Sequence, residues 1–259
     1  MKLNRMLLSI FILLPFAALI IVNIQPVEAQ GWLEGWGYRK SHVINGVAGA
    51  GNGYQIRITV HYGSGTDSGE NVYLNEHCKA DFGDIRFADD DGTTLLSYWM
   101  ESYTNASQAV FWVKVNDDLN TNPTTIYIYY GNLEATYGDD FSHGTSTFPF
   151  YDNFNDGLIN TTLWTTYRQS TTYIVISESG GLGRIQGKSN GVGYWGYWRS
   201  KSTYSANYAV RSRQYWYRYN VMNSHYRTGF GDADKTGTGS NGIIRRASRS
   251  WTKRNTITF

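Results

Sequence analysis

Residues 54–62 carry the clearest alternation of apolar and polar positions in the chain. The odd–even pattern assigns one set of side chains to each face: Tyr54, Ile56, Ile58, Val60 and Tyr62 against Gln55, Arg57, Thr59 and His61. A period of two residues predicts a β-strand with one buried face.

The stretch from residue 84 to residue 132 predicts three further elements. Residues 85–87 and 94–100 flank Asp89–Gly92, whose Asp-Gly step is typical of a tight hairpin. Residues 110–115 and 126–130 are apolar at nearly every position, which predicts two central strands covered on both faces. An edge strand ending near residue 44 and a short strand at 72–74 complete this part.

The second half has the same character. Residues 173–177, 183–186, 208–219 and 226–230 are predicted strands, and glycine-rich turns separate several of them. The sequence stops inside a further predicted strand at 256–259, so we expect this part to be incomplete. Aromatic residues make up 16% of the chain, which favours strands over helices. We therefore expect an all-β protein.

Charge divides the chain into two parts. Residues 30–140 hold six basic and fifteen acidic side chains, a net charge of −9, whereas residues 141–259 hold fifteen and five, a net charge of +10. We expect a β-sandwich domain at 30–140, a linker at 141–149 and a second β-domain at 150–259.

The N-terminus predicts the compartment. A short basic segment, an apolar run at 6–22 and Val27-Glu28-Ala29 follow the layout of a signal peptide, residues 1–29. An uncleaved anchor is the alternative. Both place the protein outside the cytoplasm, secreted or at the cell surface, and no later run is apolar for long enough to cross a bilayer.

A set of motifs resembles a known family. These are Trp36, Tyr38-Arg39-Lys40, residues 81–87, Tyr98-Trp99-x-Glu101, residues 111–115 and Tyr129-Tyr130-Gly131-Asn132. Over roughly 35–135 the chain is similar to the domain-of-unknown-function family 2341. The resemblance implies a β-rich module of prokaryotic surface proteins, sometimes fused to channel subunits of the MotA/TolQ/ExbB type. It implies no catalytic residue.

Residues 150–156 followed by Leu163-Trp164 resemble the opening of a concanavalin A-like (laminin G-like) jelly roll. Related glycosidases carry a Glu-x-Asp-x-Glu run whose carboxylates share one cleft. The acids here are scattered instead: Asp152, Asp156, Glu178, Asp232 and Asp234. We therefore expect no catalytic site.

Aromatic clusters are the candidate ligand contacts, because aromatic faces stack on sugar rings. They supply Trp195 and Trp198 from 194–198, and Trp216 and Tyr217 from 215–217. Since consecutive residues of a strand point to opposite faces, part of each cluster is expected in the core. Trp99 and Glu101 form a further candidate ligand contact. We favour the alternative, in which Glu101 forms a structural ion pair with Arg86.

The other polar features predict no cofactor and no metal. The five His residues lack ligand spacing, and Asp89–Gly92 lacks the alternation of a calcium loop, which favours a plain acidic turn. The basic run at 245–254 is expected to be a solvated face. We expect no nucleic-acid partner outside the cytoplasm, and anionic surface polymers or the acidic first domain fit the run better.

These features predict non-catalytic binding of a polysaccharide or surface glycan. The alternative is a structural or adhesive ectodomain that contacts a surface protein, as part of a longer channel-associated chain. A hydrolase ranks third.

Overall fold

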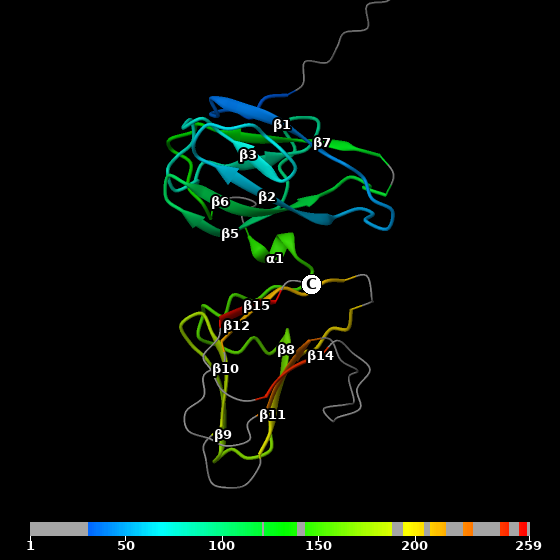
Figure 1. Ribbon diagram of the computed structural model, residues 1–259, viewed down its shortest axis with the longest axis vertical. Coiled ribbons are helices and arrows are strands. Elements are labelled where there is room, and N and C mark those ends of the chain that lie inside the picture. The colour runs from blue at the N-terminus through cyan, green and yellow to red at the C-terminus, as the bar shows by residue number, and fades with distance from the viewer. Residues whose placement is uncertain are drawn as a thin grey trace, which may run out of the picture. The chain divides into compact units, whose positions relative to one another are not determined.

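The structure, a computed structural model, is all-β apart from one short helix in the residues that it describes (Figure 1). It describes residues 31–120, 122–138, 143–187, 194–204 and 208–212, and the backbone of 213–215 and of three more strands at 225–229, 244–248 and 254–257. The predicted fold class is therefore confirmed. The chain divides into two compact units, residues 1–148 and 149–259.

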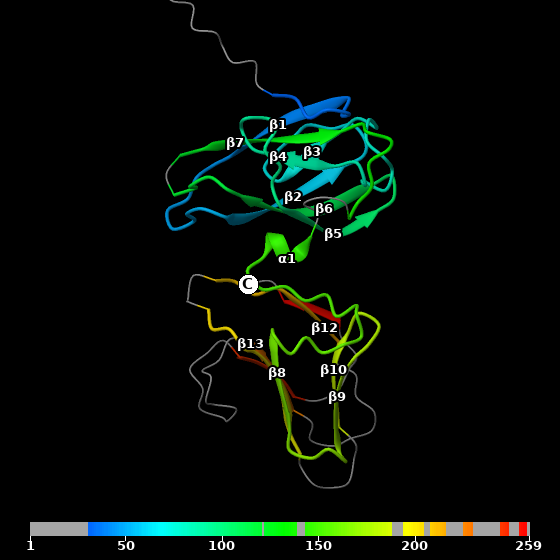
Figure 2. The same cartoon turned by 180° about the vertical axis from the view of Figure 1, so that it is seen from behind.

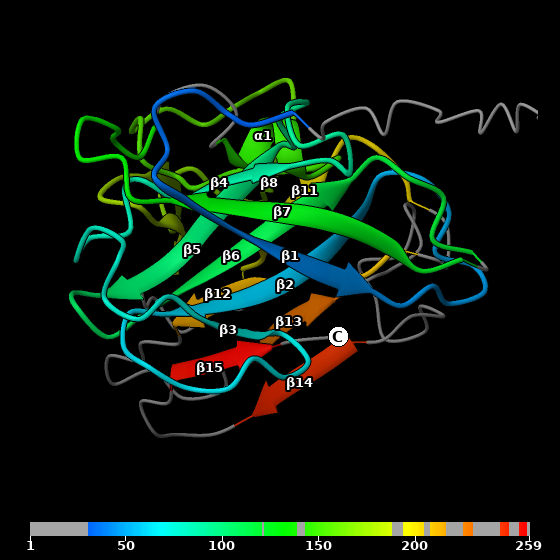
Figure 3. The same ribbon diagram turned by 90° about the horizontal axis from the view of Figure 1, so that it is seen from above.

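The first unit consists of two stacked sheets (Figures 1 and 3). The first has three antiparallel strands in the order β1 (Tyr38–Ile44), β7 (Thr124–Tyr130), β4 (Arg86–Ala88). The other has four, in the order β3 (Asn71–Tyr73), β2 (Tyr54–His61), β6 (Gln108–Val115), β5 (Tyr98–Thr104). β3 runs parallel to β2. Figure 2, the view from behind, shows β4 next to β7.

The core lies between these sheets and follows the predicted alternation. Ile58 and Val60 of β2 are fully covered and join Phe111 and Val113 of β6 and Ile128 of β7 in one cluster. β6 and β7 are each an interior strand of their sheet, as predicted. They lie in different sheets, so residues 116–123 connect the two layers.

The predicted hairpin at residues 85–100 forms only at its tip. Asp89 N donates to Thr94 O at 2.8 Å, and Ala88 bridges Leu95. Beyond the tip, β4 pairs with β7, whereas β5 pairs with β6 in the other sheet. The chain thus crosses from one sheet to the other at this turn, because the apolar side chains of β4 and β5 are buried from opposite sides of the core.

The segment that we expected to be a linker carries a short helix, α1 (Gly144–Thr147). Thr147 is buried, and α1 lies against β5 and β6 of the first unit. The ring of the next residue, Phe148, contacts Trp99 and Trp112 edge-on at centroid distances of 5.7 and 6.0 Å.

The second unit is built from antiparallel strand pairs. The pairs are β8 (Trp164–Arg168) with β11 (Gly196–Ser200), β9 (Ile174–Glu178) with β10 (Gly183–Gly187), β12 (Ser212–Tyr215) with β15 (Arg254–Ile257), and β13 (His225–Gly229) with β14 (Ile244–Ser248). Figure 2 shows β9 and β10 as one hairpin, with β8 set apart from it. Within the described part of the chain, no helix is long and apolar enough to span a membrane.

Candidate functional site

The pairing of β8 with β11 sorts the aromatic side chains of the second unit onto two faces. Tyr167 lies opposite Tyr197, and Trp164 lies opposite Ser200. Directly paired residues share a face, and consecutive residues along a strand point to opposite faces. One face therefore carries Thr165, Tyr167, Tyr197 and Arg199, with Trp195 just before β11, and the other carries Trp164 and Trp198.

Tyr167, Trp195 and Tyr197 form what we call the aromatic ladder. Their ring centroids lie 4.8 Å (Tyr167–Trp195), 5.5 Å (Tyr167–Tyr197) and 6.0 Å (Trp195–Tyr197) apart, with interplanar angles of 22–37°. Tyr167 is 41% exposed and Trp195 44%. The ladder is thus a solvent-facing group of rings held in position by one another.

Polar groups lie at both ends of the ladder. Gln169 and Trp195 bond each other twice: Gln169 N donates to Trp195 O at 3.0 Å, and Trp195 N donates to Gln169 Oε1 at 3.3 Å. At the other end, the Arg199 guanidinium lies 5.5 Å from the centroid of the Tyr197 ring. Such a frame of polar groups around an apolar surface is typical of sites that orient a ligand.

The opposite face of the β8–β11 pair packs inward. Trp198 contacts Trp164 and Phe154 edge-on, at centroid distances of 5.9 and 5.7 Å. Trp164 Nε1 donates to Asp152 Oδ2 at 2.6 Å, which fixes the ring. The two candidates from residues 194–198 are thus on different faces, Trp195 outward and Trp198 in a packed cluster. Trp216 and Tyr217 lie outside the described residues.

Three acids of the second unit that are scattered in the sequence, Asp152, Asp156 and Glu178, interact with one another. Glu178, at the end of β9, is 6% exposed, and the charges of Asp152 and Asp156 act on it. Removal from water, followed by these acidic neighbours, raises the pKa of Glu178 to about 7. Hydrogen bonds, that of the Leu158 N–H foremost, lower the pKa of Asp156. Glu178 therefore keeps its proton up to a higher pH than an ordinary glutamate does.

The candidate pair of the first unit, Trp99 and Glu101, is engaged within the fold. Trp112 on β6 pairs with Trp99 on β5, and it donates from Nε1 to Glu101 Oε2 at 2.9 Å. Glu101 falls at a register shift between Met100 and Ser102, a β-bulge, which redirects its side chain. Phe148 lies against both indoles.

The expected ion pair between Arg86 and Glu101 is wrong. Arg86 belongs to β4 in the other sheet and donates to three carbonyls, those of Gly83, Ile85 and Thr136, at 2.9–3.1 Å. Its guanidinium lies 5.4 Å from the Trp36 ring. The ion pairs among the described residues are Lys40–Asp67 and Arg57–Glu70.

Several of the motif residues meet around the buried carboxylate of Asp84. Asp84 Oδ2 accepts from Gly131 N at 2.7 Å, Oδ1 accepts from Lys79 N at 3.0 Å, and Trp36 Nε1 donates to Asp84 O at 2.8 Å. Gly131 has φ +84°, a conformation that favours glycine. These motif residues therefore support the fold.

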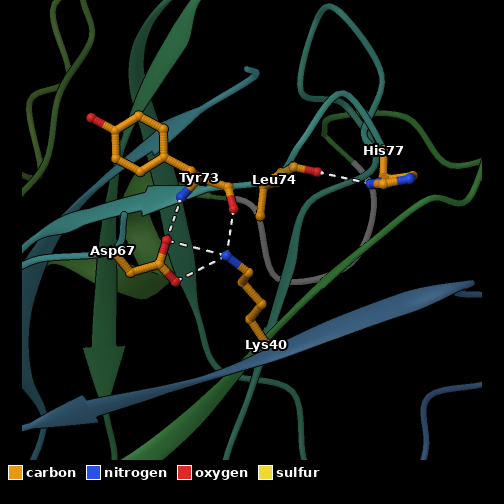
Figure 4. Close-up of polar contacts among 5 residues, drawn as sticks. All are labelled: Lys40, Asp67, Tyr73, Leu74 and His77. Carbon is orange, nitrogen blue, oxygen red and sulfur yellow. Dashed lines mark hydrogen bonds and ion pairs between the residues drawn. The ribbon is translucent and has the colours of Figure 1, made fainter. Parts of the chain in front are cut away.

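A polar cluster joins the two sheets at one edge of the first unit (Figure 4). Lys40 Nζ bonds both carboxylate oxygens of Asp67, at 3.0–3.1 Å, and the Tyr73 carbonyl. Asp67 Oδ1 also accepts from Tyr73 N at 2.8 Å. His77 Nδ1 lies 3.2 Å from Leu74 O. Nearby, burial lowers the pKa of His42 although the charge of Asp67 opposes this.

No group of three or more His, Cys, Asp or Glu side chains in the described ranges is placed to hold a metal ion. The acidic turn instead bonds itself: Asp91 Oδ1 accepts from Thr93 N and Thr94 N, both at 2.8 Å. The side chains of the basic run at 245–254 lie outside the described residues.

Comparisons with known proteins bear on the first unit and the start of the second. Curated proteins and solved structures gave no match to the chain. A family match starts at residue 81, not near residue 35 as expected, and extends beyond residue 135 into β8. It includes β4–β7 and the bonded pair Asp84 and Gly131, but neither β1–β3 nor Trp36 and Lys79 of the Asp84 site. Residues 81–167, about a third of the chain, match the family described as a domain of unknown function (DUF2341).

Proposed function

We propose that this protein is a non-catalytic, extracytoplasmic glycan-binding module, and that the aromatic ladder is its ligand contact. The N-terminal residues 1–29 act as the signal peptide in this proposal. The second unit is the binding domain, an incomplete jelly roll of the concanavalin A-like type, and the first unit is its support.

The observation that carries the proposal is the exposure of ordered aromatic rings on one strand face. Exposed apolar side chains that cluster mark ligand or partner sites, since water contact with them is unfavourable. Tyr167 and Trp195 are both over 40% exposed, whereas Trp164 and Trp198 on the other face of the same strand pair are partly buried against each other. Ring–ring contacts fix the ladder before a ligand arrives, which lowers the entropic cost of binding.

The test compares Trp195→Ala with Trp32→Ala, a first-unit tryptophan of similar exposure, 49% against 44%. Both variants and the unaltered protein are run in affinity electrophoresis through gels containing hydroxyethylcellulose, xylan, mannan or polygalacturonate. We expect at least one polysaccharide to retard the protein, and Trp195→Ala to weaken that retardation about tenfold, the value of about 1.4 kcal/mol of stacking. Trp32→Ala should leave it unchanged.

Folding of each variant is checked by hydrogen exchange at the amides of β8 and β11. Trp198→Ala is unsuitable as a binding test, because it removes a ring from the packed cluster. Failure of every polysaccharide to retard the unaltered protein would overturn the proposal and favour the structural or adhesive ectodomain. Release of reducing sugar from a bound polysaccharide would overturn its non-catalytic part.

A further inference from the structure

We infer that β1 is a docking edge at which two copies of this chain pair, strand against strand, related by a two-fold axis at Ser41. β1 is the outer strand of its three-stranded sheet, so antiparallel pairing of two β1 strands joins the sheets of both copies into one. The inference rests on the first unit alone and does not depend on the glycan binding proposed above.

A hydrogen bond on the far side of the sheet fixes which backbone groups of β1 face outward. Phe87 O of β4 accepts from Leu96 N at 2.9 Å, so the backbone groups of Phe87 point away from β7. In an antiparallel sheet these directions alternate along each strand and between successive pairs. Phe87 pairs with Ile128 and Ile128 pairs with Lys40, so the groups of Ile128 and Lys40 point toward each other. The backbone groups that point to the outer edge of β1 are those of Arg39, Ser41 and Val43.

The other three sheet edges of the first unit are closed by bonds from elsewhere in the fold. At β3, Tyr73 N donates to Asp67 Oδ1 at 2.8 Å. At β5, Met100 N donates to the Tyr137 hydroxyl at 2.9 Å. At β4, the returning residues 94–96 take up the edge. From the residues that the structure describes, no such bond reaches the outward groups of β1, and groups of this kind are a template for a further strand.

The two cations of β1 do not guard this edge. A charged side chain on an edge strand usually prevents pairing with another chain. Lys40 Nζ, however, is held on the carboxylate of Asp67 at 3.0–3.1 Å. Arg39 Nη1 donates to the carbonyl of Gly31 at 2.5 Å. Val43, in contrast, is 60% exposed, so the edge presents backbone groups next to an uncovered apolar side chain.

The side chains of β1 suit a second copy of the same strand. With the axis at Ser41, Arg39 of one copy faces Val43 of the other, and Lys40 faces His42. Burial lowers the pKa of His42, which favours the neutral imidazole, so no two like charges lie directly opposite. The outward groups of each copy then meet those of the other and bond them. An acidic peptide gains less at this edge, because both cations are already bonded within the fold.

The experiment is sedimentation velocity of the full chain from about 1 to about 100 μM, because a dimer dissociates on dilution. Ser41→Pro removes an outward N–H and places a ring against the other strand, and proline at such an edge position leaves the bonds to β7 intact. Val43→Lys and Val43→Glu place a like or an opposite charge across from Arg39 of the other copy. Val47→Lys is the control, since Val47 is 66% exposed but lies past the end of β1.

We expect a monomer–dimer equilibrium that Ser41→Pro weakens about tenfold or more, because each copy loses a donor. Val43→Lys should weaken the dimer about threefold or more and Val43→Glu should strengthen it, whereas Val47→Lys should leave it unchanged. Oxidation of Ser41→Cys should cross-link the dimer, since paired Cα atoms about 5.5 Å apart are within reach of a disulfide. The natural thiol, Cys78, is buried and should not contribute.

A monomer at every concentration would overturn the inference and leave the edge to an extended segment of another protein. A dimer that Ser41→Pro leaves intact, or that Ser41→Cys does not cross-link, would also overturn it, because the contact would then lie on another surface. If Ser41→Pro folds poorly, the two Val43 variants decide, because equal effects of Val43→Lys and Val43→Glu would contradict pairing with Arg39.

Discussion

Asp84 Oδ2 accepts a hydrogen bond of 2.7 Å from the backbone N–H of Gly131, 47 residues further along the chain. The bond ties the loop before β4 to the end of β7. Since Oδ1 of the same carboxylate accepts from Lys79 N, one buried side chain holds two separate backbone segments. Burial raises the pKa of Asp84, and these backbone donors limit the rise.

Asp84→Ala should destabilise the first unit by about 2–4 kcal/mol, because each buried N–H left without an acceptor costs about 1–3 kcal/mol. Hydrogen exchange at the amides of β1 and β7 measures the loss in this unit alone. Asp81→Ala is the control, since Asp81 is exposed and accepts from the nearby Gly83 N–H. Equal losses in the two variants would show that Asp84 holds nothing together.

Gly92→Ala should destabilise the first unit more than Gly69→Ala. Both glycines have positive φ, +76° and +54°, which costs an alanine about 1–2 kcal/mol. A Cβ on Gly92 would also lie 2.3 Å from the carbonyl oxygen of Gly31, whereas one on Gly69 meets nothing within 4 Å. We expect a further loss of about 1–3 kcal/mol from this overlap.

The same pair of variants tests the docking of the segment that follows residue 30. Arg39 Nη1 donates to Gly31 O at 2.5 Å and its guanidinium lies 4.6 Å from the Trp32 ring centroid. Limited proteolysis should therefore cut near Trp32 faster in Gly92→Ala than in Gly69→Ala. Identical cleavage rates would contradict the close approach of this segment to the turn.

Cys78 should be a poor nucleophile in the folded protein. Burial, and secondarily the charge of Asp84, raises the pKa of the thiol to about 12, so little thiolate exists at pH 8. Labelling with iodoacetamide at pH 8 should be far slower than that of glutathione and should accelerate in urea. Because Cys78 is the sole cysteine, the mass of the product reports on this site alone. Native labelling at the glutathione rate would contradict the buried thiol.

The sequence predicted strands well where the alternation was regular, as at Ile58 and Val60. It could not predict which sheet each strand joins. The Asp-Gly turn beyond Ala88 has the local chemistry of a hairpin, yet β4 and β5 part because long-range packing outweighs the turn. Turn residues report on local geometry, whereas strand partners depend on what the whole core must bury.

The candidate sites show the same division. Parity predicted that Trp195 and Trp198 face opposite sides but not which side is exposed, since that depends on β8 and on the loop carrying Phe154. Tyr167, predicted neither as a strand residue nor as a contact, joins the ladder through its register with Tyr197. The bulge at Glu101 breaks the alternation from which its position had been inferred, and no residue type marks it in advance.

The β9–β10 hairpin should lose stability as the pH rises from about 4.5 to about 7. The pKa of Glu178 is raised from 4.5 to about 7 in the folded protein, so folding favours its protonated form. That contribution is complete below the unfolded pKa and disappears as the pH passes the folded value. Hydrogen-exchange protection of the β9 and β10 amides, corrected for the intrinsic rate at each pH, should fall across this range.

Glu178→Gln, which stays neutral, should give flat protection between these pH values. Asp156 cannot replace Glu178 in this role, because its pKa is lowered and its contribution is therefore lost only as the pH falls, not as it rises. An unchanged slope in Glu178→Gln would show that Glu178 does not hold the proton.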